Sequence, residues 1–218
     1  MVLIPAGEFL MGCADDDPLA LPFDKPAQQP QHPVYLNAYY IDRREVTNAE
    51  YEAFDHTRNR NTVVSPCDDC PVQDVTWFQA KAYCEGQNPP KRLPTEAEWE
   101  KAAKGGEPSG NPGLLENYAW YSKNSITRAQ PVAQKWTNGY GLFDMLGNVR
   151  EWTADWYDPN YYQLRVYDNP KGPPTGQRRV ERGGAFFLPR RGVTTTIRYN
   201  HPPTFHLYFL GFRCVQDP

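Results

Sequence analysis

Two carboxylates within residues 141–157 could hold a metal ion. Asp144 and Glu151 are seven positions apart, and Gly147 lies between them. A glycine lets the backbone turn so that carbonyl oxygens face inward between the acids, and hard cations such as calcium prefer carboxylate and carbonyl oxygens. The same spacing is also typical of an amphipathic turn with solvated acids, followed by tryptophans of the core. The spacing alone leaves both interpretations open.

The composition limits the classes of partner. The chain has 218 residues, which is enough for one domain, expected to span residues 1–218, with a sizeable core. Its net charge of −3 and pI near 5.8 argue against nucleic acid as a partner. No apolar run approaches a membrane span, and the mean hydropathy is −0.74, so direct membrane insertion is not expected. A protein or a small molecule is the expected partner.

Five cysteines are too few for a disulfide-built scaffold. Cys67 and Cys70 have Cys-x-x-Cys spacing, but no second pair of cysteines or histidines completes a zinc site. A local disulfide or two plain thiols therefore fits this pair better than a redox or zinc centre.

Capping boxes predict three helices in the first half of the chain, because each pairs a threonine with an acid or amide three residues later. They are formed by Thr47 with Glu50, Thr76 with Gln79, and Thr95 with Glu98. Short strands are predicted at residues 2–4, 8–12, 32–42, 118–121, 131–133, 179–182, 194–199 and 211–215. The predicted helices lie in the first half of the chain, and short antiparallel strands with much irregular loop follow in the second half. This order indicates an α+β fold.

Six segments together resemble one family. They are MVLIPAGEFLMG at 1–12, RREVTNAEY at 43–51, RLPTEAEWE at 92–100, GLFDMLGNVREW at 141–152, RGG at 182–184 and GFRC at 211–214. In this order, and over essentially the whole chain, they resemble the formylglycine-generating enzyme/sulfatase-modifying-factor domain. The resemblance implies a C-type-lectin-like fold.

The resemblance also implies a structural calcium ion. Asp144 and Glu151 match the side-chain ligands, whereas Gly147 and Val149 match the backbone carbonyl ligands. A second calcium site of the family is less expected here, because the intervening loop is shorter. It would fall on Asn117, Tyr118, Asn124 and Ile126.

Cys84 and Cys214 match a family disulfide that joins the helical part to the last strand. We expect this bond, and with it an extracytoplasmic location, although no signal peptide precedes Val2. Two buried thiols are the alternative if the protein is cytosolic.

The family's catalytic apparatus has no counterpart in this sequence. The oxidase uses two cysteines shortly after the Gly-Gly, where thiolates suit a copper(I) ion that activates oxygen. Leu188 and Val193 stand at these positions, and a second family disulfide would end on Ala103 and Arg198. We therefore expect neither copper nor formylglycine-generating activity.

Residues 185–210, which correspond to the family's substrate groove, are rich in aromatic residues and arginine. Such side chains dominate binding surfaces, although Phe186 and Phe209 are expected to belong to the core. His201 and His206 could bind a metal together, but surface histidines are commoner. The candidate ligand-binding residues are Phe187, Arg190, Arg191, Arg198, Tyr199, His201, His206 and Tyr208.

Three functions fit these observations. The first is a non-catalytic binding module on a calcium-stabilised scaffold, as part of a larger protein or assembly. The second is the substrate-holding part of an oxygen-dependent enzyme similar to the sulfoxide synthases. The third is a hypervariable receptor similar to the variable proteins of diversity-generating retroelements. Residues 185–210 contain no Lys, Glu, Gln, Met or Trp, which fits mutation of adenines in asparagine codons.

Overall fold

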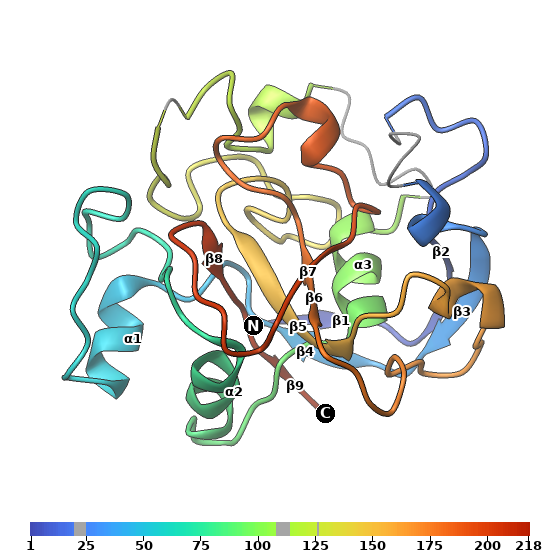
Figure 1. Ribbon diagram of the computed structural model, residues 1–218, viewed down its shortest axis with the longest axis horizontal. Coiled ribbons are helices and arrows are strands. Elements are labelled where there is room, and N and C mark those ends of the chain that lie inside the picture. The colour runs from blue at the N-terminus through green and yellow to red at the C-terminus, as the bar shows by residue number, and fades with distance from the viewer. Residues whose placement is uncertain (20–24, 108–113, 126) are drawn as a thin grey trace.

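The computed structural model describes residues 1–19, 25–107, 114–125 and 127–218. Three α-helices, short strands in three sheets and long connecting loops make an α+β fold (Figure 1). Among the described residues, no helix has the length and apolar character needed to cross a membrane.

The three helices begin where the sequence predicts. They are α1 (Asn48–Phe54), α2 (Trp77–Glu85) and α3 (Glu96–Lys104), and all three capping boxes are formed. Gly105 ends α3 in the left-handed conformation, with φ of 64°, which glycine adopts without strain. Four short 3-10 helices lie in the described loops: η1 (Lys25–Gln28), η2 (Leu115–Asn117), η3 (Tyr161–Leu164) and η4 (Arg190–Gly192).

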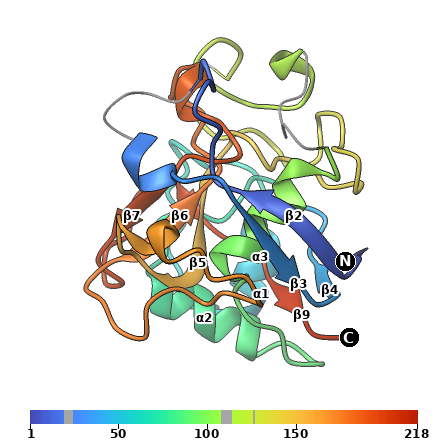
Figure 2. The same ribbon diagram turned by 90° about the vertical axis from the view of Figure 1, so that its right-hand side faces the viewer.

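The strands form three sheets. One sheet, ordered β1-β4-β9, joins β1 (Val2–Ile4), β4 (Tyr39–Ile41) and β9 (Val215–Gln216), so both ends of the chain pair with β4 (Figure 2). A hairpin-like pair joins β2 (Gly7–Met11) to β3 (His32–Leu36). The third sheet, ordered β7-β6-β5-β8, joins β5 (Arg150–Trp156), β6 (Arg179–Arg182), β7 (Tyr199–His201) and β8 (Leu210–Gly211).

Some predicted strands differ from the observed ones. Residues 131–133 are turn and loop, and residues 118–121 contribute only an isolated bridge between Trp120 and Gly147. The strand predicted at 194–199 is β7, which begins only at Tyr199. β5 has no counterpart among the predicted strands. Its burial pattern shows why, because its first four residues are all buried and the alternation that marks a half-exposed strand is absent.

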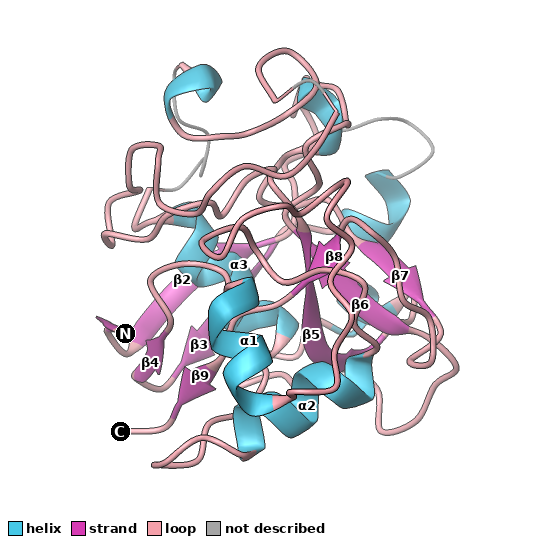
Figure 3. Cartoon of the chain, turned by 90° about the vertical axis from the view of Figure 1, so that its left-hand side faces the viewer, coloured by secondary structure: helices cyan, strands magenta, loops and turns pink. Residues whose placement is uncertain are grey.

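Two apolar clusters hold the sheets and helices together. One packs α3 against β1 to β4 and β9, around Trp99. The other packs α1 and α2 against the third sheet, around Trp152 and Phe212 (Figure 3). The predicted disulfide lies inside the second cluster, where Cys84 is bonded to Cys214 with a Cα–Cα distance of 5.7 Å.

Helix α3 is buried along its whole length, charged residues included. Glu100 pairs with Arg182 at 2.5 Å and with Lys104 at 2.9 Å. Glu96 pairs with Arg198 at 2.7 Å. Buried charges are tolerated only when paired and hydrogen-bonded, so these pairs tie α3 to the 182–198 segment.

Asp155 lies beside this network without a cation of its own. Its Oδ2 accepts a hydrogen bond from the Glu96 N–H at 2.8 Å. Burial, followed by the negative charge of Glu96, raises the pKa of Asp155 well above its usual value. Between the unfolded pKa, near 4, and the higher folded pKa, the carboxyl holds its proton only in the folded state. Over this range the free energy of unfolding of the protein falls as the pH rises.

We therefore expect Asp155→Asn to stabilise the protein relative to wild type, and increasingly so from pH 4 to pH 8. At pH 4 the carboxyl is neutral in the folded state and about half ionised in the unfolded state, so the two proteins should differ little. Urea unfolding at several pH values measures the difference. A difference that stays constant with pH would contradict the raised pKa.

Candidate cation site and recognition surface

The loop before β5 is tightly wound. Asp144, Gly147 and Asn148 all have positive φ, at 55°, 78° and 51°. A Cβ on Gly147 would lie 2.0 Å from the Trp120 carbonyl oxygen, so only glycine fits there. The loop thus brings Asp144 to the end of β5 that carries Glu151.

Asp144 is buried, and only one of its two carboxylate oxygens has a hydrogen-bond partner among the described residues. Its Oδ2 accepts a hydrogen bond from the Ala133 N–H at 2.7 Å, whereas its Oδ1 has no protein partner. Burial is the main cause that raises the pKa of Asp144 to about 6. An unpaired buried carboxylate oxygen is costly, and a cation would remove that cost.

Glu151 is already paired with an arginine. Arg213 donates to both of its oxygens, from Nε at 2.8 Å and from Nη2 at 2.7 Å. The indole of Trp99 donates to Oε2 at 2.8 Å. Among the described residues, its Oε1 accepts only the Arg213 bond, so a carboxylate lone pair remains for a further ligand.

A third buried acid, Glu45, joins this group and was not predicted. Its Oε1 accepts from the Val149 N–H at 3.2 Å, and its Oε2 accepts from the Asn148 amide at 2.7 Å. Burial and the charges of Asp144 and Glu151 raise its pKa well above the usual value. In the sequence Glu45 stands alone in RREV, and no local spacing connects it to residues a hundred positions later.

The charges in this site fit a divalent ion. Glu45, Asp144 and Glu151 share one buried guanidinium, that of Arg213. When all three acids are ionised, Arg213 balances one of the three negative charges, and the partly exposed Lys135 also attracts Asp144. Within the described residues, no group of three His, Cys, Asp or Glu side chains is arranged to hold a metal by itself. Calcium would therefore depend on carbonyl oxygens as well as on Asp144 and Glu151, as its preference for oxygen allows.

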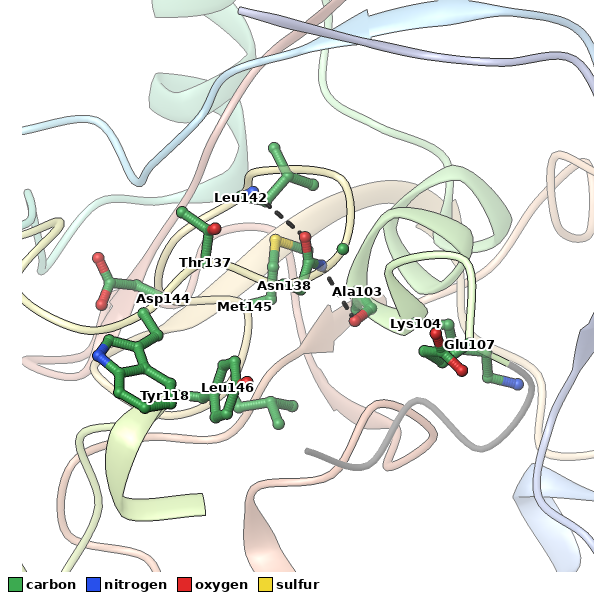
Figure 4. Close-up of a pocket in the computed structure, with 12 residues that line it drawn as sticks. Ala103, Lys104, Glu107, Tyr118, Thr137, Asn138, Leu142, Asp144, Met145 and Leu146 are labelled. Atoms are coloured by element: carbon green, nitrogen blue, oxygen red, sulfur yellow. Dashed lines mark hydrogen bonds between the residues drawn. The ribbon is translucent and has the colours of Figure 1, made fainter. Parts of the chain in front are cut away.

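A pocket of about 130 Å³ borders the site and has Asp144 in its lining (Figure 4). Asn138 links the loop that lines the pocket to α3. The Asn138 amide donates to the Ala102 carbonyl at 2.7 Å and accepts from the Leu142 N–H at 3.2 Å. Leu142 and Met145 line the pocket on the same loop as Asp144. The segment that carries Asp144 is thereby anchored to the end of a buried helix.

The described residues of the second predicted calcium site form hydrogen bonds and ring contacts with neighbouring residues. The Asn124 amide accepts from the Tyr121 N–H at 3.0 Å and donates to the Ala119 carbonyl at 2.9 Å. The Asn117 carbonyl accepts from the Trp136 N–H. Tyr118 packs edge-on against Trp136, and Ile126 lies outside the described residues.

In the 185–210 region, the expectation that Arg198 faces a ligand is wrong. Arg198 is buried, and two of its nitrogens bind Glu96 at 2.7 and 2.9 Å. Its Nη1 donates to the carbonyl oxygens of Ala27 and Asp158. The side chain therefore belongs to the interior network around α3.

The two histidines do not form a pair, because each is bonded to an acid. His201 Nδ1 lies 2.5 Å from an oxygen of the fully buried Glu181. His206 Nδ1 lies 2.8 Å from an oxygen of Asp74. Neither bond supports the alternative of a shared metal ion.

Other candidate residues do lie at the surface. Phe187 is 36% exposed and Tyr208 is 45% exposed, with ring centroids 6.4 Å apart. Arg190 and Arg191 are also exposed. Tyr199 is half-buried, and its hydroxyl donates to the Gly192 carbonyl at 3.0 Å. Phe186 is buried, as expected.

Comparison with known proteins identifies the family. The model of the sulfatase-modifying factor enzyme 1-like domain matches residues 1–218. The chain belongs to this family. The formylglycine-generating enzyme of Bos taurus is 30% identical over 291 aligned residues, which cover 100% of this chain and 74% of the relative.

Solved structures agree with this assignment. Treponema denticola variable protein 1 has 28% identity and a TM-score of 0.82, covering 100% of this chain and 95% of that one. PvdO from Pseudomonas aeruginosa has a TM-score of 0.86 at 23% identity, covering 99% and 93%. The sulfatase-modifying-factor fold, which is C-type-lectin-like, therefore extends over the whole chain.

Within this sulfatase-modifying-factor domain, Leu188 and Val193 pack together in one small apolar cluster. Val193 is buried there with Leu115 and Leu146, and Leu188 packs against it. Gly184 permits the close approach of this segment, since a Cβ would lie 2.2 Å from the Gly192 carbonyl oxygen. The two positions thus form an apolar contact.

The remaining cysteines are also placed. Cys67 and Cys70 form a local disulfide, one of the two states that the sequence left open. Backbone bonds link this small loop to the candidate cation site, because the Val132 N–H donates to the Asp69 carbonyl and the next residue, Ala133, donates to Asp144. Cys13 is a buried free thiol.

Proposed function

We propose that this domain is a non-catalytic binding module that recognises a protein or small-molecule ligand through the surface of residues 185–210. One observation carries the proposal. Leu188 and Val193, which we assign to the positions of the family's catalytic cysteines, are aliphatic and belong to an apolar cluster, while Phe187, Arg190 and Arg191 beside them are exposed. Copper(I) needs soft sulfur ligands, and residues 185–213 contain none.

We further propose that calcium stabilises the scaffold. Asp144 and Glu151 would supply side-chain oxygens, Gly147 and Val149 would supply carbonyl oxygens, and Glu45 would add to the negative charge. The unpartnered Asp144 Oδ1 and the excess of buried acids over cations support this assignment. The bound ion would neutralise these acids and hold the loop before β5. The second site at residues 117–126 has weaker support, because the Asn124 amide is already used in a turn.

The two disulfides favour an extracytoplasmic location, because such bonds persist mainly in oxidising compartments. We also propose that the domain acts within a larger protein or assembly. Reactivity of Cys84 and Cys214 toward a thiol alkylating agent, measured in unfolded protein taken directly from cells, tests the location. Full alkylation without reductant would contradict it.

A copper(I) competition experiment tests the loss of the oxidase site. Wild-type protein should not withdraw copper(I) from a chromogenic chelator such as bathocuproine disulfonate. Leu188→Cys with Val193→Cys, which adds two thiols within one cluster, should withdraw about one copper(I) per chain. Leu188→Ser with Val193→Ser serves as the matched control. Tight copper(I) binding by the wild type would contradict the proposal.

A hypervariable receptor is the second candidate, favoured by the likeness to Treponema denticola variable protein 1 over the whole chain. The amino acids absent from residues 185–210 fit this candidate. Sequencing the same locus in many isolates is the test. Amino-acid changes concentrated in codons 185–210 would support it, and unvarying codons there would exclude it.

A further inference from the structure

A row of side chains in cation–π, edge-to-face and tilted ring contacts runs from the buried Arg150 and the half-buried Tyr199 and Phe209 to Phe187 and Tyr208 on the proposed recognition surface. The ring of Phe187 lies 4.9 Å from that of Phe209, and the Arg150 guanidinium lies 5.0 Å from Phe209 and 3.5 Å from Tyr199. Tyr208 contacts both Phe187 and Phe209. We call these five residues the aromatic row. Because each ring is held by its neighbours, the row is ordered before any partner binds.

A buried acid extends the row to His201. Glu181 is fully buried and lies 3.4 Å from Arg150 and 2.5 Å from His201 Nδ1. The His201 ring stacks on Phe205, with centroids 4.9 Å apart and an interplanar angle of 12°. With Nδ1 committed to Glu181, the second ring nitrogen is left to face a partner from a half-exposed position.

The charge of this surface is opposite to that of the whole chain. Residues 185–210 contain no Asp or Glu. Arg190 and Arg191 are exposed, and within the described part of the chain neither forms an ion pair with an acid. Glu181, which lies next to the row, is buried between Arg150 and His201. Apart from Asp74, which is bonded to His206, the surface is therefore aromatic and cationic on a molecule with a net charge of −3.

Such a surface complements carboxylates accompanied by aromatic rings. Exposed guanidinium groups form paired hydrogen bonds with carboxylates, and aromatic rings favour edge-to-face packing against rings such as Phe187 and Tyr208. Nucleic acid also offers rings and negative charge, but it carries a phosphate at every nucleotide, whereas a polypeptide segment can limit its acids to positions opposite the two exposed arginines of this acidic chain. A polypeptide segment is the better complement.

We propose that the aromatic row, with Arg190, Arg191 and His201, binds an acidic polypeptide segment of a partner protein that also carries aromatic side chains. This inference rests on the proposed function and specifies its partner. Carboxylates of the segment pair with the two arginines, its aromatic side chains pack on Phe187 and Tyr208, and the second ring nitrogen of His201 forms a hydrogen bond with the segment.

Binding of synthetic polymers tests this inference. Fluorescence anisotropy should show that a random copolymer of glutamate and tyrosine binds the full chain. Polyglutamate should bind about tenfold more weakly, and a lysine–tyrosine copolymer should not bind. Raising the salt concentration should weaken binding, because exposed charges are screened.

Two variants locate the site. Arg190→Glu with Arg191→Glu should abolish binding, and Phe187→Ala with Tyr208→Ala should weaken it by about tenfold or more. Arg43→Glu with Lys171→Glu reverses two exposed charges elsewhere and should leave binding unchanged. Circular dichroism of each variant checks that it is folded.

Several results would overturn the inference. One is equal affinity for polyglutamate and for the glutamate–tyrosine copolymer. Another is tighter binding of single-stranded DNA than of the copolymer. A third is a loss of binding in the control variant as large as that in the two site variants. Absence of binding by any of the polymers would also overturn it. That last result would leave the proposed function standing, because the copper(I) competition tests the loss of the oxidase site without reference to the partner.

Discussion

Removing the disulfide between Cys84 and Cys214 is expected to lower the free energy of unfolding by about 5 kcal/mol. The bond joins residues 130 positions apart. In the chain-entropy model such a large loop restricts the unfolded chain strongly. Both sulfurs also lie in the apolar cluster that packs α2 against β5 and β8. Urea unfolding of Cys84→Ala with Cys214→Ala, compared with wild type, measures the loss.

The second disulfide provides a matched control. Cys67→Ala with Cys70→Ala removes the same chemical groups, but the bond closes a loop of only three positions. The same model gives a loss of about 2 kcal/mol for so small a loop. Equal losses for the two pairs would contradict the assignment of the long-range bond as the main covalent constraint on the unfolded chain.

Calcium removal is expected to lower the melting temperature. Binding to the folded state alone stabilises by about 3 kcal/mol when the free ion exceeds its dissociation constant a hundredfold. Without the ion, Glu45, Asp144 and Glu151 share one buried guanidinium, that of Arg213, and among the described residues the buried Asp144 Oδ1 has no hydrogen-bond partner. Differential scanning calorimetry with added calcium and with added chelator measures the shift.

Asp144→Ala separates calcium binding from ordinary packing. It should lower the melting temperature in calcium, and chelator should then have no further effect. The variant also loses the hydrogen bond from Ala133, which costs about 1 kcal/mol in either condition, so the response to calcium is the diagnostic quantity. Asp16→Ala, an exposed acid in a distant loop, should keep the wild-type response. A wild-type melt that is insensitive to chelator would contradict the site.

Local sequence signals predicted the helices because their causes are local. A capping box needs only a threonine and an acid or amide three residues later, and all three are formed at Thr47, Thr76 and Thr95. Strand β5 was missed because both of its faces are covered. A strand of that kind lacks the alternation by which half-exposed strands are recognised.

Long-range pairing explains the errors at the candidate site. Arg198 was placed on the recognition surface because arginine usually faces solvent. Its partner Glu96 lies 102 residues earlier, and no local pattern connects them. Glu45 was missed for the same reason, since its contacts to Asn148 and Val149 cross about a hundred residues. The pairing of Cys84 with Cys214 was predicted only through resemblance to the family.

Formylglycine production tests the central claim, that this surface binds without chemistry. Purified protein is incubated with copper, oxygen, a thiol reductant and a cysteine-containing sulfatase peptide, and the peptide mass is followed. A catalytically active formylglycine-generating enzyme serves as the positive control. We predict no conversion of cysteine to formylglycine by the wild-type domain. Catalytic turnover of the peptide would contradict the account, which proposes that Leu188 and Val193 replace the thiolate pair that holds copper.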